Sequence, residues 1–141
     1  MQLANSAQGL AVSRWGERVE FYVDIAKRRV TVRFGRKVTA ADIRSYADHL
    51  RTNPAFDPKF SEIVDLREVE DLDLKAQDFL KLADEIDPFS PVARRAFVIR
   101  TSVQTHAARM HKILRAEKNM GIFSSMEQAE EWIEWRPAAR D

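Results

Sequence analysis

Apolar and polar residues alternate along two short stretches between positions 18 and 34 of the chain. A period of two residues is typical of a β-strand that buries one face and exposes the other. Only the short segment IAKR separates the two stretches, so together they predict an antiparallel hairpin. The inward positions are Val19, Phe21 and Val23 in the first stretch and Val30, Val32 and Phe34 in the second.

Helices are predicted where apolar residues recur at a spacing of three to four. Three of these helices begin at a capping-box pair, in which a Ser or Thr precedes an acid or amide by three positions. The pairs are Thr39 with Asp42, Thr101 with Gln104, and Ser124 with Glu127. A further helix is expected to end before Pro88.

In each predicted helix, we expect the residues of the apolar stripe to face the core. The helix before Pro88 carries Phe79, Leu82, Ala83 and Ile86. The helix after Thr101 carries Val103, Ala107, Met110 and Leu114. The last helix carries Met126, Ala129 and Ile133.

Continuous apolar runs later in the chain predict buried strands. They occur in EIVDL at 62–66, in AFVI at 96–99 and in Gly121 to Phe123. The resulting order, ββαβαβα(β)α, predicts an α/β fold with a largely parallel sheet and right-handed crossovers. We expect a single domain over 14–136, a loose N-terminal tail at 1–13 and a C-terminal tail at 137–141.

Composition excludes several kinds of site and partner. The chain has no cysteine, which excludes disulfides, cysteine-bound zinc, iron–sulfur clusters and a thiol nucleophile. Lys and Arg number 23 against 22 Asp and Glu, so no charge excess favours nucleic acid or an anionic membrane. No apolar run approaches the roughly 20 residues that span a bilayer, and the N-terminus lacks the basic start of a signal peptide. We therefore expect a cytoplasmic protein that neither binds nucleic acid nor inserts into a membrane.

Specific motifs for cofactors and metals are absent from the sequence. The glycines are isolated, so there is no dinucleotide fingerprint or P-loop, and no serine lies in a GxSxG motif. His106 and His111 lie about 140° apart around a helix, too far to share a metal ion. We expect no cofactor, no metal site, and ordinary solvent-facing or half-packed histidines. The basic residues expected on the solvent face of that helix are Arg109, His111, Lys112, Arg115 and Lys118.

Residues 65–78, DLREVEDLDLKAQD, are rich in acids. Asp65 follows a predicted strand, where an aspartyl nucleophile could lie, but Arg67 stands where that chemistry usually needs a second acid. Asp71 and Asp73 form a D-x-D triplet of the kind that can hold a divalent ion. Carboxylates near a helix start can instead accept its free N–H groups and complement its dipole. We expect capping and solvation to account for these acids, and we assign no catalytic residue.

Trp132 and Trp135 lie near the end of the last predicted helix. The two rings cannot easily point inward together with Ile133, so we expect at least one to pack on the core and one to be exposed. Tryptophan is enriched at the energetic centres of protein interfaces. Trp132 and Trp135 are therefore candidates for a dimer or partner interface.

The stretch RVTVRFGRKVTAADIRSYADHLRTNPAFDPKFSEIVDLREVEDLDLKAQDF, followed by PFSPVARRAFVI, resembles the STAS-like, SpoIIAA-like bacterial proteins, the anti-sigma factor antagonist family. The resemblance covers residues 18–135 and rests on the element order and on the junction that follows the central strand. It implies a single layer of four or five mixed, mostly parallel strands with about four helices. It also implies a non-enzymatic role in binding a partner protein.

The antagonists of this family are switched off by phosphorylation of a serine that opens the helix after the central strand. In this chain, Asp73 matches the aspartate before the serine pair, whereas Leu74 and Lys75 stand in place of the serines. Neither residue can accept a phosphate. The chain thus resembles a branch that lacks the switch, some members of which are likened to CRAL-TRIO lipid-transfer domains.

Ligands and partners of open α/β sheets meet the carboxyl ends of the parallel strands. The candidate binding residues at that edge are Arg36, Asp65, Arg67, Asp73, Lys75, Arg100 and Thr101. They offer no obvious nucleophile and base, so a regulatory or interaction module that binds an unknown protein partner, and can form a homodimer, is the leading hypothesis.

Two alternatives remain open. One is a binder of a small amphipathic or lipid-like ligand, based on the aromatic loop residues Phe56, Phe60 and Phe89. The other is a carboxylate-dependent hydrolase or transferase that uses Asp65, Asp71 and Asp73.

Overall fold

The computed structural model describes residues 10–15, 19–116 and 118–135. The strands are β1 (Leu10–Trp15), β2 (Val19–Asp24), β3 (Arg29–Phe34), β4 (Lys37–Thr39), β5 (Ser61–Asp65), β6 (Asp71–Asp73), β7 (Arg95–Val98) and β8 (Met120–Phe123). The helices are α2 (Ala40–Arg51), α3 (Ala76–Lys81), the π-helical turn η1 (Leu82–Ile86), α4 (Ser102–Arg115) and α5 (Met126–Glu134). No helix in these ranges is both long enough and apolar enough to cross a membrane.

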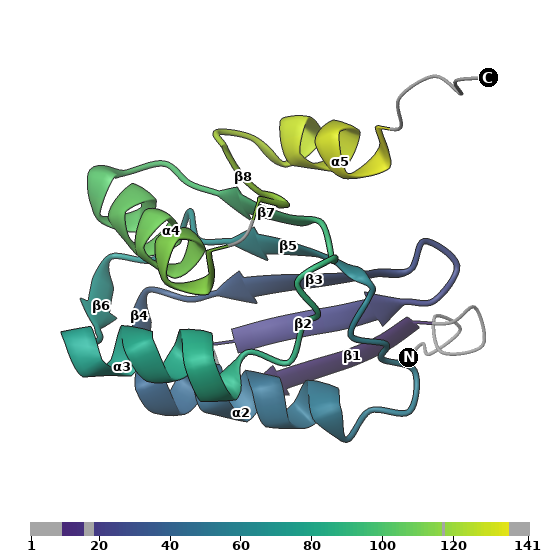
Figure 1. Ribbon diagram of the computed structural model, residues 1–141, viewed down its shortest axis with the longest axis horizontal. Coiled ribbons are helices and arrows are strands. Elements are labelled where there is room, and N and C mark those ends of the chain that lie inside the picture. Colours follow the sequence, from purple (N-terminus) through teal and green to yellow (C-terminus); the bar gives the residue numbers. More distant parts are fainter. Residues whose placement is uncertain (1–9, 16–18, 117, 136–141) are drawn as a thin grey trace.

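The main sheet has the strand order β1-β2-β3-β5-β7-β8 (Figure 1). Strands β1, β2 and β3 pair antiparallel, and every pair from β3 to β8 is parallel. The predicted hairpin is β2 and β3, with Val23 opposite Val30. Two further strands, β4 and β6, form a small parallel pair. The predicted α/β class with a mixed, mostly parallel sheet is confirmed.

Helices cover both faces of the sheet, as the alternation of side chains along β5 and β7 requires. On one face, Val64 and Phe97 belong to the larger core cluster, to which α2 contributes Tyr46 and Leu50. On the other face, Ile63 packs in a smaller cluster with the α5 residues Ala129 and Ile133. Figure 1 shows α5 on the opposite side of the sheet from α2 and α3, and Ala108 of α4 belongs to the larger cluster.

Strand β1 shows that the folded domain begins earlier than the predicted residue 14. It begins at Leu10, within the segment expected to be a loose tail, and pairs with β2 from Leu10 opposite Asp24 to Trp15 opposite Val19. Strand β2 would otherwise present a row of unpaired backbone groups at the edge of the sheet, and β1 satisfies them. The remaining tail positions, 1–9 and 137–141, lie outside the described residues.

The inward face of α4 also differs from the prediction. Val103 is 49% exposed, whereas Gln104 is 1% exposed and Ala108 is fully buried. The helix is therefore rotated by about one residue from the apolar stripe. Its inward face includes polar side chains that bind polar partners, which apolar periodicity cannot reveal. His111 is half-packed, as predicted, but with Arg115 it faces the interior instead of solvent.

The predicted helix starts are otherwise close to those observed. Thr39 caps α2 through a capping box with Asp42, and Thr101 caps α4 through one with Gln104. In α5 the cap lies one residue later than predicted, at Ser125, whose hydroxyl accepts from the backbone N–H of Gln128. The residue before it, Ser124, bonds to the Gln128 side chain instead.

A group of buried charges joins the sheet to the helices. Arg95 on β7 donates from Nε to Glu62 Oε1 on β5, at 3.0 Å. Tyr46 on α2 donates its hydroxyl to the other oxygen of Glu62, at 2.6 Å. Burial, and next the charge of Glu62, raise the pKa of Tyr46 well above its ordinary value, so the hydroxyl stays protonated. Sheet and helix are thus linked by charge-assisted hydrogen bonds.

Asp87, just after η1, is the second acid of this group, and its side chain is 2% exposed. Its Oδ2 lies 2.8 Å from Arg95 Nη1, 2.7 Å from His111 Nε2 and 3.5 Å from Arg115 Nε. Burial alone would raise the pKa of Asp87. The hydrogen bond to His111 and the charge of Arg95 outweigh burial and hold that pKa well below its usual range. We refer to Tyr46, Glu62, Asp87, Arg95, His111 and Arg115 as the buried ionic cluster.

We expect Asp87→Asn to lower the free energy of unfolding by about 3 kcal/mol at pH 7, because it leaves buried arginines without their acid. A depressed carboxylate pKa stabilises the fold above the unfolded value near pH 4, and this contribution is lost as the pH falls. The wild-type free energy of unfolding should therefore decline below about pH 5, and the decline should be shallower in the variant. Chemical denaturation at several pH values measures both effects.

Asp84→Asn is the matched control, because Asp84 is an exposed acid of η1. It should change stability by no more than about 0.5 kcal/mol. Equal losses in the two variants would contradict the assigned role of Asp87.

Candidate functional site at the carboxyl edge of the sheet

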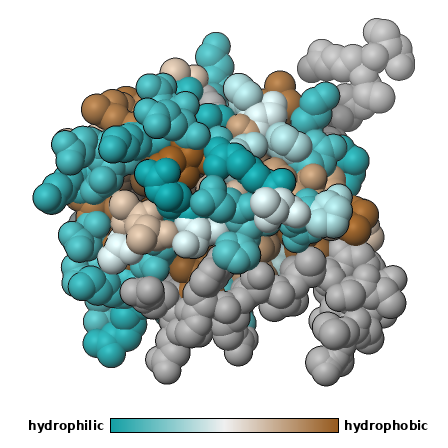
Figure 2. All heavy atoms as spheres, turned by 90° about the horizontal axis from the view of Figure 1, so that it is seen from below, coloured by the Kyte–Doolittle hydropathy of each residue, from teal (hydrophilic) through white to brown (hydrophobic). Residues whose placement is uncertain are grey.

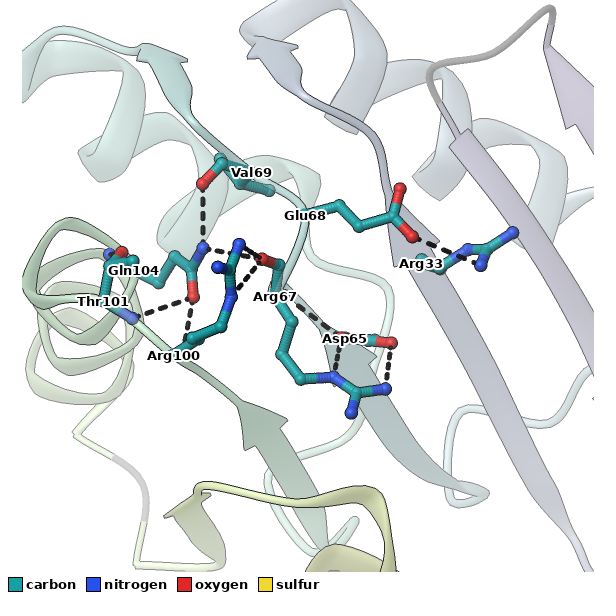
Figure 3. Close-up of polar contacts among 8 residues, drawn as sticks. All are labelled: Arg33, Asp65, Arg67, Glu68, Val69, Arg100, Thr101 and Gln104. Atoms are coloured by element: carbon teal, nitrogen blue, oxygen red, sulfur yellow. Dashed lines mark hydrogen bonds and ion pairs between the residues drawn. The ribbon is translucent and has the colours of Figure 1, made fainter.

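The carboxyl ends of β5 and β7 bring together four of the predicted site residues. Asp65 ends β5 and Arg67 follows it, while Arg100 and Thr101 follow β7 and lead into α4 (Figure 3). Gln104, in the first turn of α4, lies among them and connects the two loops. Parallel neighbouring strands place both loops at the same edge, as predicted from the sequence.

Asp65 and Arg67 form a two-pronged ion pair. Arg67 donates from Nε to Asp65 Oδ1 and from Nη2 to Oδ2, each at 2.9 Å, and its backbone N–H also reaches Oδ1 at 3.0 Å. Burial would raise the pKa of Asp65, but the hydrogen bonds and the charge of Arg67 hold it below the usual value. Asp65 is therefore an ionised carboxylate with both oxygens engaged.

Gln104 uses both ends of its amide at this site. Its Nε2 donates to the backbone carbonyls of Arg67 at 3.2 Å and Val69 at 2.8 Å. Its Oε1 accepts from the backbone N–H groups of Arg100 at 2.6 Å and Thr101 at 3.2 Å. One buried side chain thus joins the loop after β5 to the start of α4. The sequence indicated Gln104 as a capping residue, but not its contacts with a loop distant in the chain.

Arg100 strengthens the same connection from the solvent side. It is exposed and donates from Nε at 3.1 Å and from Nη2 at 2.5 Å to the backbone carbonyl of Arg67. Within the described part of the chain, Arg100 has no acidic partner. Its positive charge is therefore available at the surface beside the N-terminus of α4.

Arg36 follows the carboxyl end of β3 at the same edge of the sheet, and its contacts are with other residues of the loop after β5. It pairs with Glu70 at 3.2 Å, both side chains being exposed, and its backbone carbonyl accepts from the N–H groups of Glu70 and Asp71. On the nearer side of the loop, Glu68 pairs with Arg33 of β3 at 3.4 Å (Figure 3). The loop between β5 and β6 is therefore held at several points, although exposed ion pairs contribute little stability each.

No protein-family model and no curated protein matches this chain. Among solved structures, the chain is similar to an uncharacterized protein from the DUF3478 family with a SpoIIAA-like fold, from Shewanella loihica PV-4. The two share 17% identity with a TM-score of 0.55, and the match covers 88% of this chain and 91% of the other. The chain has a SpoIIAA-like fold. At this level of identity, the likeness establishes the arrangement of strands and helices only.

Within this SpoIIAA-like fold, the segment expected at the switch position runs from β6 to the start of α3. Asp73 is exposed on β6, and Lys75 is the exposed residue before α3, where its backbone N–H bonds to Asp78 at 2.8 Å. Leu74 is half-buried against the core cluster of Ala47, Leu82 and Ile86. Asp73, Leu74 and Lys75 therefore connect the small sheet to α3.

The acids of residues 65–78 are distributed over separate contacts. Asp65, Glu68 and Glu70 pair with arginines, and Asp78 accepts from the start of α3, which is the capping role expected of one of them. Asp71 and Asp73 lie exposed on β6. Across the described ranges, no group of three or more His, Asp or Glu side chains is placed to hold a metal ion.

The aromatic candidates divide between core and surface. Trp132 packs against Phe123 and beneath the Arg94 guanidinium, whereas Trp135 is 58% exposed. The loop residues Phe56, Phe60 and Phe89 pack edge to face, with Phe56 between the other two. The loop phenylalanines thus contact one another, and Phe60 and Phe89 are buried.

We expect Gln104→Ala to lower the free energy of unfolding by about 2 kcal/mol, because backbone groups of both loops lose their hydrogen-bond partner. The loop after β5 should also open more readily, since Val69 would lose the donor to its carbonyl. Amide hydrogen exchange at Val69 and neighbouring residues should therefore accelerate more than exchange in β2. Denaturant titration with site-resolved exchange measures both effects.

Gln77→Ala is the control, because Gln77 is exposed in the first turn of α3. Its substitution should leave stability within about 0.5 kcal/mol of wild type. Unchanged exchange at Val69 in Gln104→Ala would refute the connecting role of Gln104.

Proposed function

We propose that this chain is a non-enzymatic regulatory module that binds a protein partner at the carboxyl edge of its SpoIIAA-like sheet. The observation that carries the proposal is the hydrogen-bond group around Gln104, which fixes two surface loops relative to each other. A preorganised surface loses little conformational entropy on binding. The edge therefore suits recognition of a partner surface of fixed shape.

The chemistry of the edge supports binding more than catalysis. Asp65, the acid nearest to a nucleophile position, is ionised and engaged on both oxygens by Arg67. A catalytic pair needs a nucleophile within hydrogen-bond reach of a base that is available to take its proton. Thr101 instead uses its hydroxyl to accept from the N–H of Gln104.

We propose further that the module works without a phosphorylation switch. Leu74 and Lys75, which stand where the resembling antagonists carry their serines, have no hydroxyl. The half-buried position of Leu74 supports a packing role for this residue. Binding would then be controlled by the availability of the partner or by another ligand.

The test is capture of a partner by tagged protein from extract of its own cells, followed by a measured affinity for the purified partner. We expect Arg100→Glu to weaken binding at least tenfold, because it reverses a surface charge that no acid of the described chain neutralises. Arg44→Glu, an exposed substitution of the same kind on α2, should leave the affinity unchanged. A partner that binds both variants equally, or no specific partner at all, would contradict the proposed surface.

We also propose that a second copy of the chain can associate through the exposed tryptophan side of α5. Trp135 lies beside an open groove lined by Ile122, Phe123 and Trp132. Light scattering should give a dimer mass for the wild type and a monomer mass for Trp135→Ala. Leu80→Ala, which removes another exposed apolar side chain, should leave the mass unchanged. A wild-type monomer at high concentration would rule out this association.

A further inference from the structure

A partly open cavity of about 110 Å³ lies between the sheet and the helices α2, α3, η1 and α4. Val64 and Phe97 line it from the sheet, and Ala47, Leu82 and Ala107 line it from the helices. Most of the wall that the cavity exposes consists of apolar atoms. Of the three loop phenylalanines considered from the sequence, Phe89 lines the cavity, whereas Phe56 and Phe60 do not.

One part of the cavity wall is formed by the buried ionic cluster. Glu62, Asp87, Arg95 and His111 all line it. Their charged groups bond to one another and to Tyr46 and Arg115. Two carboxylates face two guanidinium groups across the cluster, so their formal charges cancel when the histidine is neutral.

The cavity approaches the surface on the side of the small sheet. Leu72, Leu74 and Ala107 line it and are half-buried, so each also contacts solvent. Figure 2 views the molecule from below, the side on which α2 and α3 lie in Figure 1. Hydrophobic atoms are visible there in gaps between hydrophilic side chains. Because Leu72 and Leu74 both line the cavity and reach solvent, a small molecule would enter on this side.

We propose that this cavity is a binding site for a small, uncharged, mostly hydrocarbon molecule with at most one hydrogen-bonding group. Its apolar body would lie between Val64, Phe97 and Leu82, and its polar group would face the buried ionic cluster. The proposal goes beyond partner binding at the carboxyl edge and does not depend on it.

The size of the cavity restricts the ligand. In another protein, an engineered apolar cavity of about 150 Å³ binds benzene. The present cavity is of similar order and therefore suits a single ring or a short aliphatic chain. A long acyl chain would require the helices to move away from the sheet.

Charge restricts the ligand further. Burying an ion in an apolar cavity costs far more than burying a neutral polar group, unless an opposite charge meets it. Here Arg95 already contacts both Glu62 and Asp87, so the guanidinium is committed to acids of the protein. A carboxylate ligand would compete with those acids, whereas an alcohol could add a hydrogen bond without adding charge. The site should therefore select alcohols over the corresponding acids.

The test uses toluene, benzyl alcohol and benzoate as probes of nearly equal size, with the full-length protein followed by NMR at neutral pH. We expect saturable shifts from toluene and benzyl alcohol at the methyl groups of Val64 and Leu82. Benzoate should bind at least tenfold more weakly than benzyl alcohol. No saturable binding of either neutral probe up to its solubility would overturn the proposal, as would benzoate binding that matches or exceeds benzyl alcohol.

Ala107→Leu should fill the cavity from α4 and reduce the affinity for both neutral probes at least tenfold. Ala41→Leu is the matched control, because the same group is added at an exposed position of α2. Undiminished binding to a folded Ala107→Leu protein would place the probes elsewhere and overturn the assignment. Should that variant fail to fold, wild-type NOE contacts decide: contacts from benzyl alcohol to Val64 and Leu82 support the site, and their absence refutes it.

Discussion

The arrangement of helices on the sheet depends on the contact of one buried guanidinium with two buried carboxylates. Arg95 on β7 binds Glu62 on the neighbouring strand β5 and Asp87 after η1. Buried charges are tolerated only when their partners are in place, and an incomplete group costs several kcal/mol. The positions of α2, η1 and α4 are therefore constrained by polar geometry as well as by apolar packing. The cavity occurs where these constrained elements leave space between them.

Helix α4 shows how this constraint reaches the surface. At its N-terminal end, Gln104 binds carbonyl groups of the loop after β5. In its later turns, His111 and Arg115 contact Asp87. Because both ends are held by directional bonds, the helix has little freedom to slide or rotate. The loop that carries Arg67 is bonded to Gln104, so its position depends on that of the helix. The buried contacts of α4 are thereby connected to the proposed binding surface.

Much of this fold could be predicted because its signals are local. The period-two pattern located β2 and β3, and the cap pairs at Thr39 and Thr101 located the starts of α2 and α4 to the residue. The prediction that Asp65, Arg67, Arg100 and Thr101 share one edge followed from parallel pairing. The inward face of α4 could not be predicted, since its polar side chains are satisfied by residues distant in sequence. A prediction from apolar periodicity assigns polar side chains to the solvent face. For the same reason, the buried ionic cluster was not predicted.

The direction in which the Asp87 side chain points depends on the number of residues in the π-helical turn η1. The N–H of Asp87 bonds to the carbonyl of Leu82, five residues back, so this turn contains one residue more than an α-helical turn. Without the additional residue, the following side chain would be displaced by about 100° around the helix axis. A carboxylate there would no longer point toward Arg95. In related sequences, the acid at the position of Asp87 and the additional residue of the turn should therefore occur together. A relative with a one-residue deletion at 82–86 should also lack this acid.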